Sequence, residues 1–264
     1  MKIHPTAIVA KGANIGADVE IGPYTIVGGE VSIGEGSRLE SHVVVEGRVR
    51  IGSNNHIGHG AIIGSLPQVV GFDSRIKSGV ELGDGNVVRE NCTIHRATDE
   101  GGSTALGNEN FLMAGAHVGH NCRVGNKVLI ANNCLLGGHV RVDDNAFLGG
   151  GSVFHQYMHV GRLAMVQGNS GFSKDIPPFL VAAEVNFVFG VNIVGLKRAG
   201  FSAEDRREIQ NAFKLLYTSG LNVSQALEKA ATENFGPAAR EFFAFVAEAK
   251  KRGVCPFKGG EEGL

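Results

Sequence analysis

Residues 106–172 determine the fold, and they read LGNENFLMAGAHVGHNCRVGNKVLIANNCLLGGHVRVDDNAFLGGGSVFHQYMHVGRLAMVQGNSGF. Every sixth residue from Leu106 onward is apolar: Leu112, Val118, Val124, Ile130, Leu136, Val142, Leu148, Phe154, Val160, Val166 and Phe172. A period of six fits neither an amphipathic helix, at about 3.6 residues per turn, nor a half-buried strand, at about 2. It is typical of short repeats stacked into a solenoid. The same sixfold pattern begins the chain, with Ile3, Val9, Ile15, Ile21, Val27, Ile33, Leu39, Val45, Ile51, Ile57 and Ile63. We call this series of apolar positions the file and its members file residues.

The repeat brings distant histidines together. Three units complete a triangular coil of about 18 residues, so residues that far apart lie above one another, roughly 4.8 Å apart as parallel strands. His120, His139 and His155 are each spaced close to one coil apart, and His117 precedes His120 within one repeat. We therefore expect the four side chains along one corner of successive coils. Because His120 and His139 follow a file residue by two or three places, they should project outward.

Two stretches interrupt the file. Residues 65–81 carry no sixfold pattern and the file resumes at Leu82, while residues 97–104 form a shorter interruption. We interpret both as loops that leave a rigid scaffold, where function often resides. Glycine often follows the file residue, as in Ile15-Gly16 and Ile33-Gly34. This suits a corner that needs either a positive φ angle or a close approach of neighbouring coils.

After Phe172 the repeat fades and a helical pattern follows. Ser202 and Asp205 resemble a capping box that opens a helix over residues 203–218. A second helix is expected over residues 224–234, and Pro237 begins a third that runs to residue 250. The predicted fold is an all-β solenoid with an α tail, with a parallel β-helix in residues 1–189 and a small helical domain in residues 190–264.

Composition narrows the function classes. A net charge of −1 and a pI near 6.8 argue against a broad nucleic-acid interface. The sequence has neither an apolar run long enough to span a membrane nor the apolar stretch of a signal peptide, so we expect a cytoplasmic protein. Cys92, Cys122, Cys134 and Cys255 include no CxxC pair. They are expected to be small buried thiols without a metal or redox role.

The corner histidines suggest chemistry at an interface. Neutral imidazole near pH 7 is suited to removing a proton from a hydroxyl group. The flat faces of a solenoid can be buried by threefold packing, which would create clefts between subunits. From the residues alone, a catalytic base and merely polar surface histidines both remain open.

Several strings resemble one enzyme family over nearly the whole chain. They are RE at residues 89–90, TIHR at 93–96, LMAGAHVGHNC at 112–122, GGHV at 137–140, FHQ at 154–156, DIPP at 175–178 and GLKRAGF at 195–201. They resemble the acyl-carrier-protein-dependent UDP-N-acetylglucosamine O-acyltransferases that begin lipid A synthesis. The resemblance implies a left-handed β-helix, a homotrimer with active sites between subunits, and a 3-hydroxyacyl donor on the phosphopantetheine of acyl carrier protein. It implies no cofactor and no metal.

The resemblance also assigns roles to residues. His120 resembles the general base for the sugar 3-hydroxyl, and the Gly138 N–H would hold the thioester oxyanion. The substrate-binding positions are His117 and His139 for the sugar, His155 and Gln156 beside the acyl chain and nucleotide, and Asn192 and Arg198. Gly168 matches the position of the acyl-chain ruler, and its missing side chain implies a long donor.

Departures from the family pattern leave other functions open. Residues 68–72 read QVVGF where the family has QDLKY, so an acid and a lysine are missing, and Arg75 or Lys77 is a candidate replacement for that cation. Ala199 replaces the second arginine of a pair, Val194 replaces a glutamate, and Asn121 follows the base where the family has Asp. A paralogous enzyme acting on a UDP-diamino sugar or another amine or alcohol is one alternative. A zinc-dependent solenoid resembling carbonic anhydrase and a non-catalytic scaffold are the others.

Overall fold

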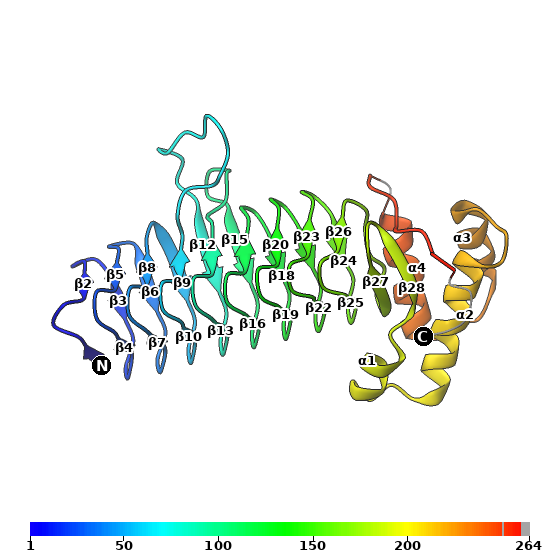
Figure 1. Cartoon of the computed structure of the whole chain (residues 1–264), viewed down its shortest axis with the longest axis horizontal. Coiled ribbons are helices and arrows are strands. Elements are labelled where there is room, and N and C mark those ends of the chain that lie inside the picture. The colour runs from blue at the N-terminus through cyan, green and yellow to red at the C-terminus, as the bar shows by residue number, and fades with distance from the viewer. Residues whose placement is uncertain (250, 260–264) are drawn as a thin grey trace.

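The computed structural model describes residues 1–249 and 251–259, which form a left-handed parallel β-helix with helices at its C-terminal end (Figure 1). Strands of successive coils pair in register, so Phe111 lies beside Leu129 and Leu129 beside Phe147. The file residues fill the narrow core, where Leu112 and Ile130, for example, are fully buried. The predicted solenoid is therefore confirmed.

Three sheets make up the three faces of the coil in the described residues. The eleven-stranded sheet contains β1 (Lys2–Ile3), β4 (Glu20–Ile21), β7 (Arg38–Leu39), β10 (His56–Ile57), β13 (Val87–Val88), β16 (Phe111–Leu112), β19 (Leu129–Ile130), β22 (Phe147–Leu148), β25 (Met165–Val166), β27 (Leu180–Ala183) and β28 (Phe187–Val191). The nine-stranded sheet contains β2 (Ile8–Val9), β5 (Ile26–Val27), β8 (Val44–Val45), β11 (Ile62–Ile63), β14 (Thr93–Ile94), β17 (His117–Val118), β20 (Leu135–Leu136), β23 (Val153–Phe154) and β26 (Gly171–Phe172). The eight-stranded sheet contains β3 (Asn14–Ile15), β6 (Val31–Ile33), β9 (Arg48–Ile51), β12 (Gly79–Leu82), β15 (Ser103–Leu106), β18 (Arg123–Val124), β21 (Arg141–Val142) and β24 (His159–Val160).

The glycines that follow file residues serve close packing of the coils. A Cβ atom on Gly16 would lie 2.8 Å from the backbone nitrogen of Glu35 in the next coil, which no real Cβ tolerates. Gly16 does not have a positive φ angle, whereas several corner residues with side chains do, including Asn121 at 61° and His139 at 60°. Of the two explanations that the sequence left open, close approach is the correct one at Gly16.

Both predicted loops exist, but each ends earlier than expected. The long loop lies between β11 and β12, and the short one between β14 and β15. Strand pairing resumes at Gly79, which pairs with both Arg48 and Ser103. The predicted ends at residues 81 and 104 therefore lie inside strands, because β12 and β15 have four residues each where most strands of the coil have two.

The helices of the tail are α1 (Ile193–Arg198), α2 (Ala203–Tyr217), α3 (Val223–Thr232) and α4 (Pro237–Glu248). The predicted capping box is confirmed, since the Ser202 hydroxyl accepts a hydrogen bond from Asp205 N and the Asp205 carboxylate accepts one from Ser202 N. The later helices begin and end within a few residues of their predicted bounds, although residue 250 lies outside the described residues. The sequence did not predict α1 or the antiparallel pairing of β27 with β28.

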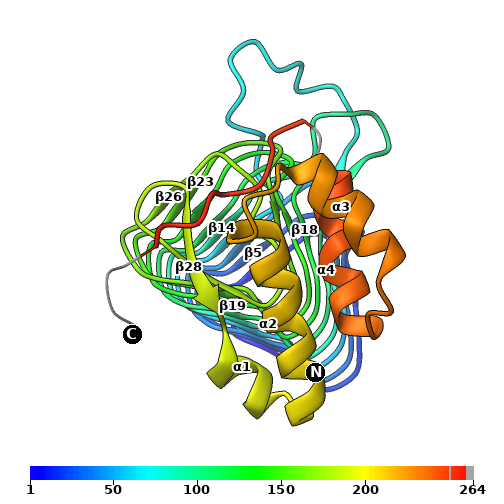
Figure 2. The ribbon, with the colours of Figure 1, turned by 90° about the vertical axis from the view of Figure 1, so that its right-hand side faces the viewer.

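The chain returns to the solenoid after α4. The C-terminal segment runs back past β28 (Figure 2), where Cys255 N donates to the backbone oxygen of Asp175 and Phe257 forms a bridge with Val188. The predicted boundary between residues 189 and 190 falls inside β28. Cys255 and the other cysteines, at positions 92, 122 and 134, are all fully buried as predicted. Burial raises the pKa of Cys92 to about 11, which keeps the thiol protonated at neutral pH.

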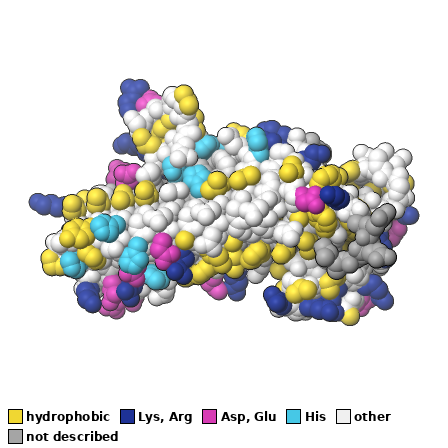
Figure 3. Space-filling view, in the orientation of Figure 1, with side chains coloured by type: hydrophobic (Ala, Val, Ile, Leu, Met, Phe, Trp, Pro, Cys, Tyr) yellow, Lys and Arg dark blue, Asp and Glu magenta, His cyan; other side chains and the backbone are white. Residues whose placement is uncertain are grey.

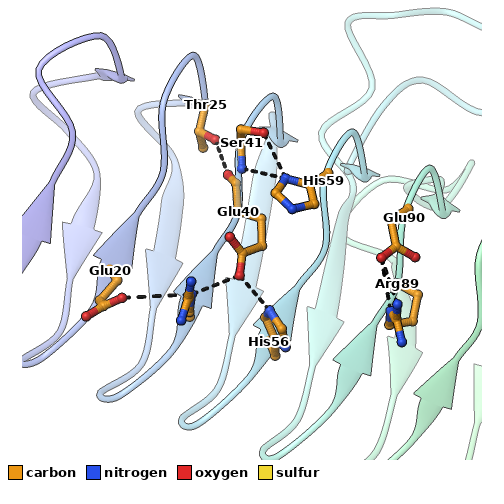
Figure 4. Close-up of polar contacts among 9 residues, drawn as sticks. Glu20, Thr25, Glu40, Ser41, His56, His59, Arg89 and Glu90 are labelled. Carbon is orange, nitrogen blue, oxygen red and sulfur yellow. Dashed lines mark hydrogen bonds and ion pairs between the residues drawn. The ribbon is translucent and has the colours of Figure 1, made fainter.

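The outward side of the eleven-stranded sheet changes character along the coil. Near the N-terminus it is charged: Glu40 forms an ion pair with Arg38, at 2.8 Å, and accepts a hydrogen bond from His56, at 2.9 Å (Figure 4). Further along, the residues aligned with His56 in successive coils are all apolar: Val87, Phe111, Leu129, Phe147, Met165 and Val181. The apolar half of this face is therefore suited to contact with another protein surface. None of the helices described here is long and apolar enough to cross a membrane.

Candidate active site

The predicted histidine corner is present at the junction of the nine-stranded and eight-stranded sheets. His120 follows β17, His139 follows β20 and His155 follows β23, and the His120 and His139 rings meet edge to face with centroids 5.2 Å apart. His117 lies one step earlier, on β17 itself. Histidine side chains gather below the protruding loop, between rows of hydrophobic side chains (Figure 3).

Gly138 lies directly beside His120 in the next coil. A Cβ atom on Gly138 would overlap the Nε2 and Cε1 atoms of the His120 ring, so only glycine leaves room for the imidazole. The residue is buried, and among the described residues no acceptor takes a hydrogen bond from its backbone N–H. A backbone N–H without a protein partner can donate to a ligand, and this one belongs to a residue that lies against the His120 ring.

The hydrogen-bond network assigns the tautomer of His120. His120 Nδ1 lies 2.9 Å from Asn121 Oδ1, and that oxygen also accepts hydrogen bonds from the backbone N–H and the hydroxyl of Thr98, each at 3.0 Å. Because the backbone N–H can only donate, the atom of Asn121 that faces it must be the oxygen. His120 therefore carries its proton on Nδ1 and presents a lone pair at Nε2, as a general base requires.

The neighbouring imidazoles are held neutral. Burial, with smaller contributions from His95 and His120, lowers the pKa of His117 to about 4. Burial also lowers the pKa of His95. His117 Nδ1 is 2.7 Å from the Thr93 hydroxyl, and its ring meets His95 edge to face with centroids 5.1 Å apart. Neutral rings can hydrogen-bond to a sugar as donor and acceptor without adding positive charge beside the base.

The depressed pKa of His117 predicts a loss of stability in acid. Between pH 6.5, the ordinary value, and pH 4 the unfolded chain binds a proton at this residue that the folded chain does not, so stability falls as pH falls. We expect His117→Gln to reduce this loss, because glutamine cannot be protonated. Thermal unfolding midpoints at pH 7 and pH 5 measure it. An equal drop in midpoint for both proteins would contradict the assignment.

The long loop is tied to the corner by two neighbouring side chains. His95 Nδ1 is 2.7 Å from the backbone oxygen of Leu66, and Arg96 donates to the backbone oxygen of Ser74 at 3.0 Å. Arg75, one candidate for the missing loop cation, is already paired with Asp73 at 2.8 Å. The loop can contribute to the site, but the charge of Arg75 is largely neutralised within the loop itself.

Three predicted substrate residues lie away from His120 in a single chain. Asn192 caps α1, where its Oδ1 accepts from Gly195 N and its Nδ2 donates to the Leu163 oxygen, each at 2.9 Å. Arg198 is exposed at the end of α1, and this helix lies at the C-terminal end of the solenoid (Figure 1). Gly168 follows β25 and lies at the other edge of the nine-stranded sheet. By contrast, His155 and Gln156 are exposed at the His120 corner.

Sequence reasoning missed other contributors. Tyr157 stacks on His139 with centroids 4.4 Å apart, and the Lys251 ammonium lies 4.7 Å from the centre of the Tyr157 ring. Thr98 reaches Asn121 from the short loop. The spacing of Tyr157 from His139, one coil along, could have revealed that contact, but no repeat places Lys251 or Thr98. Across the described part of the chain, no three His, Cys, Asp or Glu side chains are grouped as potential metal ligands.

Together, the coil and its corner define a hexapeptide-repeat β-helix with a cluster of histidines at one corner. Family models agree: "Bacterial transferase hexapeptide (six repeats)" matches residues 12–47, 30–65 and 103–138, and "Udp N-acetylglucosamine O-acyltransferase; Domain 2" matches residues 175–255.

Relatives identify the family more closely. The acyl-[acyl-carrier-protein]–UDP-N-acetylglucosamine O-acyltransferase of Paraburkholderia phymatum is 47% identical over 227 residues, covering 85% of this chain and 86% of the relative. The enzyme of the same name from Halorhodospira halophila is 45% identical over 229 residues, with 86% and 88% covered. The crystal structure of the Francisella novicida UDP-N-acetylglucosamine acyltransferase superimposes with a TM-score of 0.92 at 35% identity, covering 98% of this chain and 95% of that one. The chain belongs to the acyl-[acyl-carrier-protein]–UDP-N-acetylglucosamine O-acyltransferase family.

Proposed function

We propose that the protein transfers a 3-hydroxyacyl chain from acyl carrier protein to the 3-hydroxyl of UDP-N-acetylglucosamine, the first step of lipid A synthesis. The observation that carries this proposal is the contact between the His120 ring and Gly138, whose N–H has no partner among the described residues. Acyl transfer to an alcohol needs both a base for the nucleophile and a donor for the oxyanion. Family membership supports the substrate pair.

The reaction follows from these two groups. His120 Nε2 takes the proton of the sugar 3-hydroxyl as its oxygen attacks the thioester carbonyl. The Gly138 N–H donates to the oxygen of the tetrahedral intermediate, which carries the negative charge. The intermediate collapses, the carbon–sulfur bond breaks, and the imidazolium returns its proton to the departing phosphopantetheine thiolate. The products are the O-acyl sugar nucleotide and the free thiol of the carrier.

Substrate contacts complete the proposal. The sugar would lie between His117 and His139, with the nucleotide and acyl chain beside His155 and Gln156. The outward apolar residues of the eleven-stranded sheet support a homotrimer, in which a neighbouring subunit can bring Asn192, Arg198 and Gly168 to the corner. Sedimentation at micromolar concentration tests the trimer, and a monomer would contradict it.

Acyl carrier protein is the proposed macromolecular partner. Exposed basic side chains on the tail include Lys197, Arg198, Arg207 and Lys214, which suit an acidic carrier. Acyl carrier protein and a nucleotide sugar as substrates, together with membership of the family, support a cytoplasmic reaction that needs no cofactor.

A second acceptor is favoured by the long loop. Its residues 69–71 carry no charge and Val69 is 41% exposed, whereas the exposed charges of the loop, Asp73, Arg75 and Lys77, lie further along it. A UDP-linked sugar with a 3-amino group is the alternative acceptor, because an amine needs less activation than a hydroxyl.

The experiment compares acceptors directly. UDP-N-acetylglucosamine, its 3-amino analogue and an unrelated amine are each incubated with 3-hydroxyacyl carrier protein, and products are identified by mass spectrometry. We expect an alkali-labile ester of UDP-N-acetylglucosamine. An amide formed only with the 3-amino analogue would favour the alternative, and acylation of the unrelated amine alone would contradict both.

Donor length is predicted from Gly168. This residue is exposed, and a Cβ placed on it would lie 3.0 Å from the Gly150 oxygen of the neighbouring coil, so a side chain there would take up surface space beside that coil. We expect the wild-type protein to prefer long donors and Gly168→Met to prefer shorter ones, since each methylene excluded from an apolar groove costs about 0.8 kcal/mol. Rates measured across a series of donor lengths check this. An unchanged preference would remove the ruler from this position.

A further inference from the structure

We propose that Asp99 is a positioning residue for the base, acting on His120 through Asn121. The inference deepens the proposed function and rests on it. It assigns a role to the short loop between β14 and β15, which delivers Asp99 to the corner from outside the repeat.

The contacts form an unbroken chain. Asn121 Nδ2 donates a hydrogen bond to Asp99 Oδ1, and Asn121 Oδ1 lies 2.9 Å from His120 Nδ1. Asn121 is itself fixed by its backbone, with φ at 61° and its N–H donating to the Thr104 hydroxyl at 2.8 Å. The amide therefore connects a carboxylate to the imidazole with little freedom to move.

Asp99 determines which way the Asn121 amide faces. An ionised carboxylate can only accept hydrogen bonds, so it holds the NH2 side of the amide. Thr98 N–H can only donate, so it holds the oxygen side at 3.0 Å. Both neighbours therefore select the same orientation, which forces the proton of His120 onto Nδ1 and leaves Nε2 free to act as the base.

The charge of Asp99 also reaches the corner. Within the described residues no Lys, Arg or His lies within ion-pair distance of Asp99, so its charge is not neutralised by a neighbour. The pKa of His139 is lowered chiefly by burial and next by the neighbouring His120, whereas the carboxylate of Asp99 raises it. Because Asp99 contacts the amide that holds His120, its negative charge also stabilises the imidazolium that forms on His120 during the reaction.

The short loop is built to hold this carboxylate. Arg48 donates to the backbone oxygens of Gly101, at 2.8 Å, and Gly102, at 3.0 Å. Glu100 accepts from Lys77 N at 2.9 Å, which joins the short loop to the long one. A Cβ atom on Gly102 would overlap the Asp99 carboxylate, so glycine makes room for it.

Removing the charge is the first test. We expect Asp99→Asn to lower kcat about tenfold with an unchanged KM for UDP-N-acetylglucosamine, since the substrate does not contact Asp99. The matched control is Glu100→Gln, which removes the adjacent carboxylate of the same loop and keeps an acceptor for Lys77 N. It should retain wild-type kcat. Wild-type kcat in Asp99→Asn would overturn the proposal.

Exchanging the two side chains separates positioning from loop stability. Asn121→Asp alone places two carboxylates in contact and should be slow. Combining Asn121→Asp with Asp99→Asn restores one carboxylate and one amide in the same contact, with the carboxylate now against His120 Nδ1. We expect the double variant to recover to within about threefold of wild type. A double variant that folds with a wild-type melting temperature but is no faster than Asp99→Asn would contradict the relay.

A spectroscopic measurement tests the Asp99–Asn121–His120 relay separately from the proposed acyl transfer. Long-range proton–nitrogen correlation spectra of histidine-labelled protein report which ring nitrogen carries the proton. We expect His120 to be protonated on Nδ1 in the wild type and to lose that preference in Asn121→Ala. Protonation on Nε2 in the wild type would overturn the relay even if acyl transfer occurs. An Nδ1 proton without acyl transfer would overturn the function and leave the relay standing.

Discussion

His120→Ala should abolish most acyl transfer while leaving the fold intact. The side chain is half-buried at a corner and contributes nothing to the file residues of the core. Loss of a general base costs about 10² to 10⁴ in rate. Initial rates with a 3-hydroxyacyl carrier protein, measured beside thermal unfolding, check both parts of this expectation.

The matched control is His59→Ala. His59 also follows a file residue by two places, after Ile57, but it lies at another corner and hydrogen-bonds Ser41 at 2.8 Å (Figure 4). We expect this variant to keep wild-type activity. Near-normal turnover in His120→Ala would show that another group removes the proton.

Gly138→Ala should be nearly as damaging as loss of the base. The added Cβ would overlap Nε2 and Cε1 of His120, so the ring must move away from both the substrate and the N–H of residue 138. Misplacing an oxyanion donor alone costs about 10² to 10³ in kcat. Gly138 has no positive φ angle, so alanine fits the backbone and stability should change little.

Gly29→Ala provides the comparison for this change. Its Cβ would lie 3.7 Å from the Ala10 Cβ, an ordinary van der Waals contact, far from the corner. Both variants should unfold at similar temperatures, and only Gly138→Ala should lose activity. Equal kcat for Gly138→Ala and wild type would remove residue 138 from the oxyanion site.

The sequence predicted the solenoid because burial in a narrow coil imposes its period on the chain. Ile130 and Leu136 must be apolar since no water reaches them, and their spacing is therefore visible without a structure. The same period explains why the meeting of His120 with His139 was predictable. Residues one coil apart stack as neighbouring strands do, so the sequence spacing is a spatial distance.

The remaining parts of the site were hidden because they lie outside that period. Asp99 and Thr98 belong to a loop whose backbone is held by Arg48 of β9. In the eight-stranded sheet, β9 lies three strands away from β18, the strand that follows Asn121. Lys251 arrives after α4, through the pairing of residues near Cys255 with Asp175. The helix α1 has only six residues and relies on the Asn192 cap and buried Leu196, which is too short a pattern to recognise.

The crystal structure of the protein with UDP-N-acetylglucosamine bound tests the central claim most directly. The account predicts that the sugar 3-hydroxyl oxygen lies within about 2.6 to 3.2 Å of His120 Nε2, the reach of a general base. It also predicts that the Gly138 N–H faces the same side of the sugar, where the thioester would enter. A sugar nucleotide bound away from this corner, or a 3-hydroxyl that faces a different side chain, would contradict the assignment of the active site.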